Sequence, residues 1–287
     1  MADINYIRPK SFQEALDFLT ANGRETRILA GGTDVMVDLR AGEIKQKYLL
    51  DISRLKELRG IELNDEGLSI GAAVTLSEIH ASPIIAEFAP TLRQCAATFA
   101  SQQIRNVATI GGNVAHCSPC GDTIPPLVVH EARAVLAGKS GCREIPVEFI
   151  SSGSYKCSLP SDELIVRFIL KPCKAEYAGF KKIGRRKALA IARVNMAVLA
   201  QKDVDGKVEF IRLALGSCTP TPWRLKEIEE FLAGQVPTEA LIWQAGRMLA
   251  EKTIEITGRR ASVIYKEPAI QGLFLRMLCP LVHHDRV

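Results

Sequence analysis

Apolar positions in the first half of the chain occur at helical and at strand spacing in turn, which predicts alternating helices and strands. A capping-box pattern at residues 11–14 predicts a helix that ends at residues 22–23, with the glycine in the left-handed conformation. Short strands are predicted at residues 26–30 and 47–52. A hairpin is predicted at residues 61–74, closed by Asn-Asp-Glu-Gly.

A second capping-box pattern, at residues 75–78, predicts a short helix, and residues 90–99 carry another helical pattern. The apolar residues in 104–110 indicate a short strand that leads into Gly111 and Gly112. Two prolines then fit the first turn of a helix that runs to about residue 132.

The pattern changes near residue 173, where we place a domain boundary. Three stretches alternate in the manner of antiparallel strands, at residues 177–183, 194–202 and 208–215. Asp205 and Gly206 predict a tight hairpin between the last two. Helical patterns follow at residues 225–232, 237–252 and 269–278. We therefore expect an α+β chain that ends in a three-stranded antiparallel sheet packed with helices.

Length and composition agree with a globular protein of two domains. The chain has 287 residues, of which 47% are apolar, and its formal charge is +5. No apolar run approaches the roughly 18 residues that a membrane helix needs. The first residues lack the basic and apolar segments of a signal peptide, so we expect a cytoplasmic protein whose eight cysteines are thiols or metal ligands.

Residues 181–187 hold five basic side chains but no aromatic residue on which a base could stack. We interpret this run as a solvated turn between strands, and we do not expect nucleic-acid binding.

Two glycine pairs are the main candidates for chemistry. They lie in Ala-Gly-Gly-Thr-Asp at residues 30–34 and in Thr-Ile-Gly-Gly-Asn at residues 109–113. Glycines let backbone N–H groups approach phosphate oxygens, although a single glycine pair more often only makes a turn. Neither loop fits the Rossmann or P-loop spacing. Together they suggest a two-part cradle for a diphosphate.

The sequence of these loops resembles a known family. Residues 30–34, residues 104–113 (Ile-Arg-Asn-Val-Ala-Thr-Ile-Gly-Gly-Asn) and residues 118–122 (Ser-Pro-Cys-Gly-Asp) resemble the flavin-binding medium subunit of the xanthine dehydrogenase and carbon monoxide dehydrogenase family, the molybdenum hydroxylases. The resemblance extends over nearly the whole chain, including Pro-Thr-Pro at residues 220–222, and ends around Leu278.

This resemblance implies a fold and a cofactor. Residues 1–172 would be an FAD-binding domain of the p-cresol methylhydroxylase and vanillyl-alcohol oxidase type, with subdomains at about 1–55 and 56–172. Residues 173–287 would be the C-terminal domain of the flavin subunit. The first loop would wrap the FAD diphosphate with Ile28, Leu29, Ala30, Gly31, Gly32, Thr33, Asp34 and Val35. The second would complete the site through backbone amides, with Thr109, Ile110, Gly111, Gly112 and Asn113.

Five further residues match contact positions of the family. Phe99 would lie beside the isoalloxazine or in a helix core, and His116 would be a small polar contact or a surface histidine. Asp122 would contact the cofactor, cap the following helix, or do both. Ile165 would pack on the flavin or in a strand core. Lys181 matches a flavin-contact lysine, and we place its ammonium near the N1–C2=O edge, where it would stabilise anionic reduced flavin.

The resemblance also implies partners. The chain would take electrons from [2Fe–2S] clusters on a small subunit and pass them to an acceptor such as NAD+, while substrate binds a molybdopterin-containing large subunit, commonly in a dimer of heterotrimers. No catalytic residue is expected, because the flavin carries the chemistry. The alternatives are a self-sufficient FAD-dependent oxidoreductase of the same broad fold and a non-enzymatic binding module.

Cys117 and Cys120 form a Cys-x-x-Cys pair directly after the second loop. They are packing thiols, metal or cluster ligands, or a redox pair. An iron–sulfur cluster usually needs four thiolates, and Cys142 and Cys157 are the nearest additional candidates. We assign no metal ligands.

Overall fold

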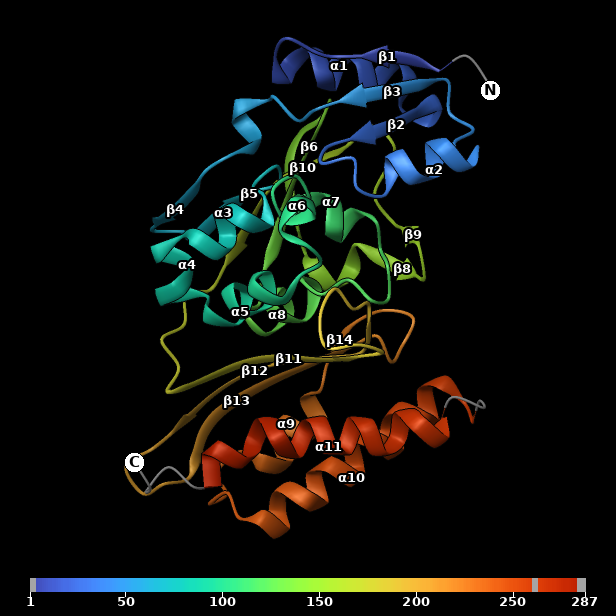
Figure 1. The fold of residues 1–287 in the computed structure, drawn as a ribbon. Helices are drawn as coiled ribbons and strands as arrows, with labels where there is room; N and C mark the ends of the chain where they lie inside the picture. The colour runs from blue at the N-terminus through green and yellow to red at the C-terminus, as the bar shows by residue number, and fades with distance from the viewer. Residues whose placement is uncertain (1–3, 260–262, 283–287) are drawn as a thin grey trace.

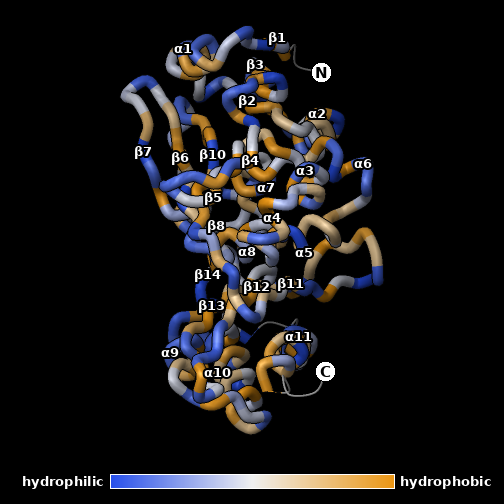
Figure 2. Tube along the Cα trace, turned by 90° about the vertical axis from the view of Figure 1, so that its left-hand side faces the viewer, coloured by the Kyte–Doolittle hydropathy of each residue, from blue (hydrophilic) through white to orange (hydrophobic). Residues whose placement is uncertain are grey.

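The computed structural model describes residues 4–259 and 263–282, and its helices and strands form three stacked parts (Figure 1). Figure 2 shows the same stack from the side, with β1 at one end and α10 at the other. A small parallel sheet comes first, a five-stranded antiparallel sheet lies in the middle, and a second antiparallel sheet carries the last helices. No helix in the described ranges is long and apolar enough to cross a membrane.

The N-terminal part is a three-stranded parallel sheet in the order β1-β3-β2. Leu50 of its central strand packs with Leu16 and Leu19 from the first helix in a small apolar core. Its elements are β1 (Asn5–Ile7), α1 (Phe12–Asn22), β2 (Thr26–Leu29), α2 (Val35–Ala41) and β3 (Tyr48–Asp51). The strands predicted at residues 26–30 and 47–52 are therefore confirmed.

The ends of α1 differ from the prediction. The Ser11 hydroxyl accepts from the Glu14 amide at 3.2 Å, but the Glu14 carboxylate accepts from the amide of Lys10, so the capping box is only half formed. Gly23 has a φ of −52°, so the predicted left-handed stop is wrong. A side chain is excluded there for another reason: a Cβ on Gly23 would lie 2.3 Å from the carbonyl oxygen of Ser161.

The middle part is an antiparallel sheet in the order β4-β5-β10-β6-β7. Its strands are β4 (Ile61–Asn64), β5 (Gly67–Gly71), β6 (Arg133–Gly138), β7 (Gly141–Pro146) and β10 (Leu164–Leu170). The helices that share its core are α3 (Leu76–Ala81), α4 (Pro83–Phe88), α5 (Pro90–Thr98), α6 (Gln102–Arg105), α7 (Ile110–Ala115) and α8 (Ile124–Val129). A short hairpin, β8 (Ser151–Gly153) and β9 (Lys156–Cys157), leads into β10.

The strand predicted at residues 104–110 is wrong, because local caps favour two short helices there. The Ser101 hydroxyl accepts from the Ile104 amide and starts α6, and the Thr109 hydroxyl accepts from the Gly112 amide and starts α7. The second glycine pair therefore lies inside a helix, whereas the first follows a strand as expected. The capping box at residues 75–78, which begins α3, is confirmed in both directions.

The C-terminal sheet has four strands, not the three that the sequence predicted. The strands, in order, are β11 (Tyr177–Gly184), β12 (Ala192–Lys202), β13 (Val208–Gly216) and β14 (Trp223–Arg224). Two residues are too few for an alternating pattern, and prolines precede them, so β14 could not be recognised from sequence. The predicted hairpin between β12 and β13 is confirmed, with Gly206 at a φ of +77°.

Three helices pack on the face of this sheet that is turned away from the middle part (Figure 1). They are α9 (Lys226–Leu232), α10 (Glu239–Thr257) and α11 (Val263–Val282). The last helix is longer than the predicted 269–278 and contains Pro268 and Pro280. The sheet's other face packs on α5 and α8 of the middle part. The first residues of the predicted FAD-binding domain, 1–3, and the last residues of the predicted C-terminal domain, 283–287, lie outside the described residues.

An ion cluster around Glu131 joins the middle part to the C-terminal sheet. The Glu131 carboxylate forms ion pairs with Arg224 at 2.7 Å, Lys171 at 3.0 Å and Arg212 at 3.5 Å. Burial alone would raise the pKa of Glu131, but hydrogen bonds from Arg224 and Lys171 lower it to about 2. This carboxylate is therefore charged at neutral pH and holds the two sheets together.

His130, the residue before it, is fully buried at the same junction. Its Nδ1 lies 3.2 Å from the carbonyl oxygen of Lys171, and its Nε2 has no hydrogen-bond partner in the described part of the chain. Burial lowers the pKa of His130 to about 4, against the opposing effect of the Lys171 carbonyl. The folded protein therefore holds this histidine neutral.

We expect His130 to make the protein sensitive to mild acid. The unfolded chain binds a proton here below about pH 6.5, whereas the folded chain does not until about pH 4, so the free energy of unfolding falls as pH drops through this window. The full loss is about 3 kcal/mol, and about 2 kcal/mol is expected between pH 7 and pH 5. Urea unfolding at the two pH values measures it.

His130→Gln should remove most of this pH dependence because its side chain stays neutral throughout. His80→Gln, at an exposed histidine, is the control and should keep the wild-type dependence. Measurements stop at pH 5, above the range in which Glu131 takes up a proton. Equal slopes for wild type and His130→Gln would show that His130 is not responsible.

Candidate functional site

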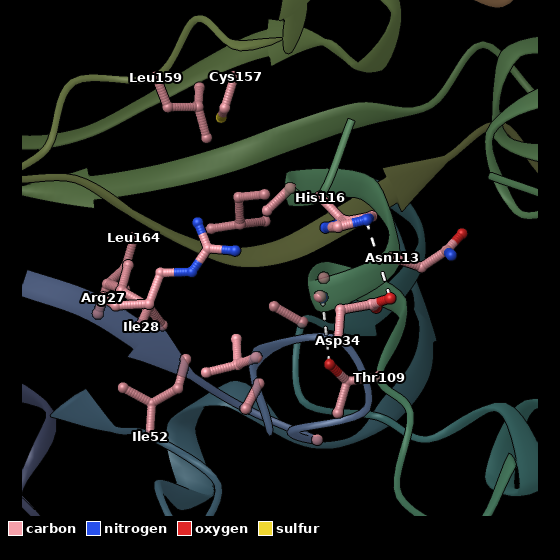
Figure 3. Close-up of a pocket in the computed structure, with 18 of the residues that line it drawn as sticks. Arg27, Ile28, Asp34, Ile52, Thr109, Asn113, His116, Cys157, Leu159 and Leu164 are labelled. Carbon is pink, nitrogen blue, oxygen red and sulfur yellow. Dashed lines mark hydrogen bonds and ion pairs between the residues drawn. The ribbon is translucent and has the colours of Figure 1, made fainter. Parts of the chain in front are cut away.

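A cleft of about 280 Å³ lies between the N-terminal parallel sheet and the middle part. Its walls are the loop at residues 30–35, the segment at residues 108–116 that includes α7, and residues 157–165 at the start of β10. Figure 3 shows these segments converging on one opening, although they are distant in sequence. The cleft therefore depends on how the first two parts pack together.

The first glycine loop presents an unusual run of backbone donors. The amides of residues 31–35 donate no hydrogen bond within the described part of the chain. Gly32 has a φ of +74°, a backbone angle that residues with side chains rarely adopt. This angle turns the backbone within the loop. A series of unpaired amides in a turned loop is a typical anion-binding arrangement, because the N–H dipoles can converge on one oxygen group.

Gly31 is required by packing. A Cβ on Gly31 would lie 2.0 Å from the carbonyl oxygen of Val107, far inside van der Waals contact. The two loops therefore approach backbone to backbone, which fixes the first loop against the entry to α7. This close approach gives the loop its shape independently of any ligand.

The second loop is built differently, because its amides are already hydrogen bonded. The amide of Gly111 donates to Ala72 at 2.9 Å, and that of Gly112 donates to the Thr109 hydroxyl at 3.1 Å. Ile110 and Asn113 also donate to backbone carbonyls. The second loop thus contributes the shape of the wall and its side chains, whereas the free amide donors come from the first.

Charged side chains lie on both sides of the opening of the cleft (Figure 3). Arg27 comes from β2, and its guanidinium reaches over the opening (Figure 3) while pairing with Asp38 at 3.1 Å. Nε2 of His116 lies 3.8 Å from the carboxylate of Asp34, and this pair bridges the two loops. Apolar side chains, among them Phe99, line the remaining wall. The cleft can therefore bind a ligand with an anionic segment and a flat apolar segment.

Most of the residues predicted for the site line this cleft. They are Ile28, Ala30, Gly31, Gly32, Thr33, Asp34, Val35, Phe99, Thr109, Gly111, Gly112, Asn113, His116 and Ile165. The four exceptions are Leu29, Ile110, Asp122 and Lys181. The roles of all these residues toward a flavin stay predictions.

The four exceptions lie behind the cleft or away from it. Leu29 and Ile110 belong to the strand and helix that carry the loops. Asp122 is buried, where it accepts from Lys182 at 2.5 Å and from Asn195 at 2.8 Å. Lys181 is exposed on β11. Neighbouring residues of a strand point to opposite faces, and the next residue, Lys182, points toward Asp122. The strand therefore turns Lys182 toward the middle part and Lys181 away from it.

Sequence reasoning missed several lining residues, chiefly the segment that precedes β10. They are Gly23, Thr26, Arg27, Ile52, Ala72, Ala108, Ala115, Cys157, Leu159, Pro160, Ser161, Glu163 and Leu164. The segment reaches the cleft because β10 pairs with β5 and β6. Only Arg27 had a local signal, as a cation in the strand that runs into the first glycine loop.

The Cys-x-x-Cys pair separates in the structure. Cys117 is buried with its thiol against the carbonyl oxygens of Val114 and Ile150, close enough to Cys157 for each to shift the other's pKa, whereas Cys120 is half-buried. Among the described residues, no three His, Cys, Asp or Glu side chains come together as a metal ion would require. All eight cysteines are free thiols.

Replacing Gly31 with alanine should unfold or severely weaken the first loop. The added methyl group would overlap the Val107 carbonyl, and we expect a loss of about 3 kcal/mol or more in the free energy of unfolding. Gly272→Ala is the control, since nothing lies within 4 Å of its Cβ and alanine favours α11. Urea denaturation of both variants tests this, and a Gly31→Ala protein as stable as Gly272→Ala would contradict the close approach.

Comparisons with known proteins agree with this architecture. Residues 2–171 match the family described as the FAD binding domain in molybdopterin dehydrogenase, and residues 178–281 match the CO dehydrogenase flavoprotein C-terminal domain. A chain in the structure of carbon monoxide dehydrogenase from Hydrogenophaga pseudoflava, in a form lacking the Mo-pyranopterin moiety of the molybdenum cofactor, superposes with a TM-score of 0.89. The two chains are 30% identical, and the match covers 96% of each.

Curated relatives agree as well. The xanthine dehydrogenase FAD-binding subunit of Escherichia coli O157:H7 is 33% identical over 79% of this chain and 78% of its own length. The nicotinate dehydrogenase FAD-subunit of Eubacterium barkeri is 28% identical over 98% of this chain and 97% of its own. The two family matches together cover nearly the whole chain. The chain therefore belongs to the family of FAD-containing subunits of xanthine and carbon monoxide dehydrogenase-type oxidoreductases.

Proposed function

We propose that the cleft binds FAD, with the diphosphate against the first glycine loop. The observation that carries this proposal is the run of unpaired amides at residues 31–35, with Arg27 beside it. A diphosphate offers oxygens to these donors, and the arginine offsets its negative charge. The glycines leave the space that a side chain would fill, so the residues present fit the cofactor.

FAD supplies hydride and electron-transfer chemistry when it is bound. The chain's own residues bind and orient it. Phe99, Ile165 and Leu159 provide apolar surface for a ring and exclude water from it. The buried Lys182–Asp122–Asn195 cluster holds the segment after α7 against the C-terminal sheet. For Lys181 we keep the inference of a flavin contact, which requires its exposed side chain to fold back toward the ring.

The domain assignment is part of the proposal. Residues 1–172 form an FAD-binding domain of the p-cresol methylhydroxylase and vanillyl-alcohol oxidase type, with subdomains of about 1–55 and 56–172. Residues 173–287 form the C-terminal domain. The separate parallel and antiparallel sheets on either side of the cleft support this division.

We further infer that the chain works as the medium subunit of a larger molybdenum hydroxylase. It takes electrons from the [2Fe–2S] clusters of a small subunit and passes them to an acceptor such as NAD+, while a large molybdopterin subunit binds the substrate. A dimer of heterotrimers in the cytoplasm is the assembly we propose. The names of the relatives support it, since they are FAD subunits of xanthine and nicotinate dehydrogenases.

The purified chain should carry about one FAD, seen as two flavin absorption bands and as FAD released by acid. Gly32→Val should abolish binding, because its side chain would strain the loop and crowd the amides. Gly206→Val is a matched control: its φ of +77° resembles the +74° of Gly32, but it lies in the β12–β13 turn far from the cleft. Both variants lose about 1–2 kcal/mol of stability, but only Gly32→Val loses FAD. A colourless chain that takes up no FAD, even with its partner subunits, would disprove the proposal.

Anaerobic mixing with NADH tests the electron acceptor. If NAD+ is the acceptor, the reverse reaction should bleach the flavin bands of the isolated chain. A flavin that dithionite reduces but NADH does not would exclude NAD+. Xanthine or nicotinate alone should leave the isolated chain oxidised, since the substrate site lies on another subunit; bleaching by either would instead favour the self-sufficient oxidoreductase.

A further inference from the structure

The thiols of Cys117 and Cys157 meet at the edge of the cleft, although forty residues separate them. Cys157 ends β9 and lines the cleft, and Cys117 follows the last residues of α7. The Cys117 thiol lies 3.5 Å from the carbonyl oxygen of Val114 and 3.8 Å from that of Ile150, and it is near enough to the Cys157 thiol for each to shift the other's pKa. A disulfide between them requires their sulfurs to close to about 2 Å by rotation of the side chains.

Backbone contacts hold the two cysteines together. The amide of Tyr155, in the turn of the β8–β9 hairpin, donates to the carbonyl oxygen of Cys117 at 2.8 Å. The thiol of Cys117 lies 3.8 Å from the carbonyl oxygen of Ile150, and the next residue, Ser151, pairs with Cys157. The hairpin is thus fixed to the end of α7 on both sides of the thiol pair.

The two thiols differ in accessibility and in acidity. Cys117 is 1% exposed, whereas Cys157 is exposed. The neighbouring Cys117 thiol lowers the pKa of Cys157 to about 6 against the opposing effect of burial, and the Leu159 amide and Arg27 add to the lowering. The neighbouring Cys157 thiol and burial raise the pKa of Cys117 well above its usual range. At neutral pH the accessible thiol is therefore the nucleophile.

We propose that Cys157 and Cys117 are a redox-active pair that forms a reversible disulfide at the rim of the cleft. The oxidant is a low-molecular-weight disulfide such as glutathione disulfide. The Cys157 thiolate attacks one sulfur of this disulfide, forms a mixed disulfide and releases one thiolate. Cys117 then loses its proton and attacks the Cys157 sulfur, which releases the second thiolate. Two electrons pass to the oxidant, whose halves leave as two thiolates, and one proton is lost, from Cys117, because Cys157 reacts as the thiolate.

The order of these steps follows from burial. An oxidant of this size reaches the exposed Cys157 but not the buried Cys117, so Cys117 can react only with a sulfur already attached to Cys157. The arrangement matches an attacking cysteine with an adjacent resolving cysteine. A third ligand for a metal is absent among the described residues, which leaves the thiols to react with each other.

A disulfide here would join two walls of the cleft. It would link the β8–β9 hairpin, which precedes Leu159, to α7, which carries Gly112 and Asn113. With this link the hairpin can no longer move away from the opening. We expect bound FAD to leave more slowly from the oxidised protein, a consequence that rests on the proposed function, whereas the disulfide itself does not.

The test incubates the full chain with glutathione disulfide at pH 7, blocks the remaining thiols with N-ethylmaleimide, and maps peptides by mass spectrometry. We expect a Cys117–Cys157 cross-link in wild type and in Cys142→Ser, which removes another exposed cysteine and serves as the control. Cys117→Ser should stop at a mixed disulfide on Cys157, and Cys157→Ser should form no cross-link. Initial reaction at Cys157 should be about threefold faster than at Cys142, because its larger thiolate fraction is partly offset by the lower nucleophilicity of a more acidic thiol.

A wild-type chain that stops at the mixed disulfide, or reacts at Cys142 as fast as at Cys157, would overturn the proposal. FAD release is measured separately, as flavin fluorescence during dialysis of the reduced and the oxidised chain. Equal release rates from a cross-linked chain would remove the clamping effect. Absence of FAD from both forms would count against the proposed function and leave the thiol pair standing.

Discussion

The close approach of the two glycine loops is the constraint on which the rest of the structure depends. Gly31 meets the backbone of Val107, and Gly111 meets Ala72, at distances that no side chain would allow. The first contact joins the N-terminal part to the middle part, and the second holds α7 against the residue that follows β5; together they shape the cleft. Because packing already fixes both loops, the free amides of the first loop are held in place before any ligand arrives, which lowers the cost of ordering on binding.

A second set of contacts places the C-terminal sheet. Glu131 gathers three cations at the junction, and Asp122 accepts from Lys182 of β11 and Asn195 of β12. The Lys182–Asp122 pair is largely shielded from water, so it depends on each partner remaining in place, whereas the Glu131 cluster is partly exposed. The segment from α7 to α8 therefore serves both sides: its start lines the cleft, and its end anchors the C-terminal domain. A movement of the C-terminal domain would therefore shift the residues of this segment that line the cleft.

The cysteines illustrate how tertiary structure redefines a motif. Spacing alone paired Cys117 with Cys120, the usual interpretation of Cys-x-x-Cys. In the fold, the turn after α7 directs Cys117 toward the β8–β9 hairpin, where it meets Cys157. The chemistry that follows belongs to a pair with one exposed and one buried thiol, beside a cation and a ligand cleft.

The sequence by itself determined the mixed α and β organisation, strands β2 to β5 and β11 to β13, both glycine loops and the family, but not strands β6, β7 and β10 of the middle sheet. These features have local signals, namely periodicity, capping residues and loop composition, and they can be recognised without knowing what packs where. Apolar pattern without caps misleads: the strand prediction for residues 104–110 counted their apolar residues and overlooked the N-cap at Ser101. Only the tertiary structure decided which amides are free, that Lys182 rather than Lys181 faces the middle part, that β14 completes the last sheet, and that residues 157–165 form a wall of the cleft. Each of these depends on strand register or on contacts between segments distant in sequence, because burial and hydrogen bonding are set by the neighbours that packing brings together.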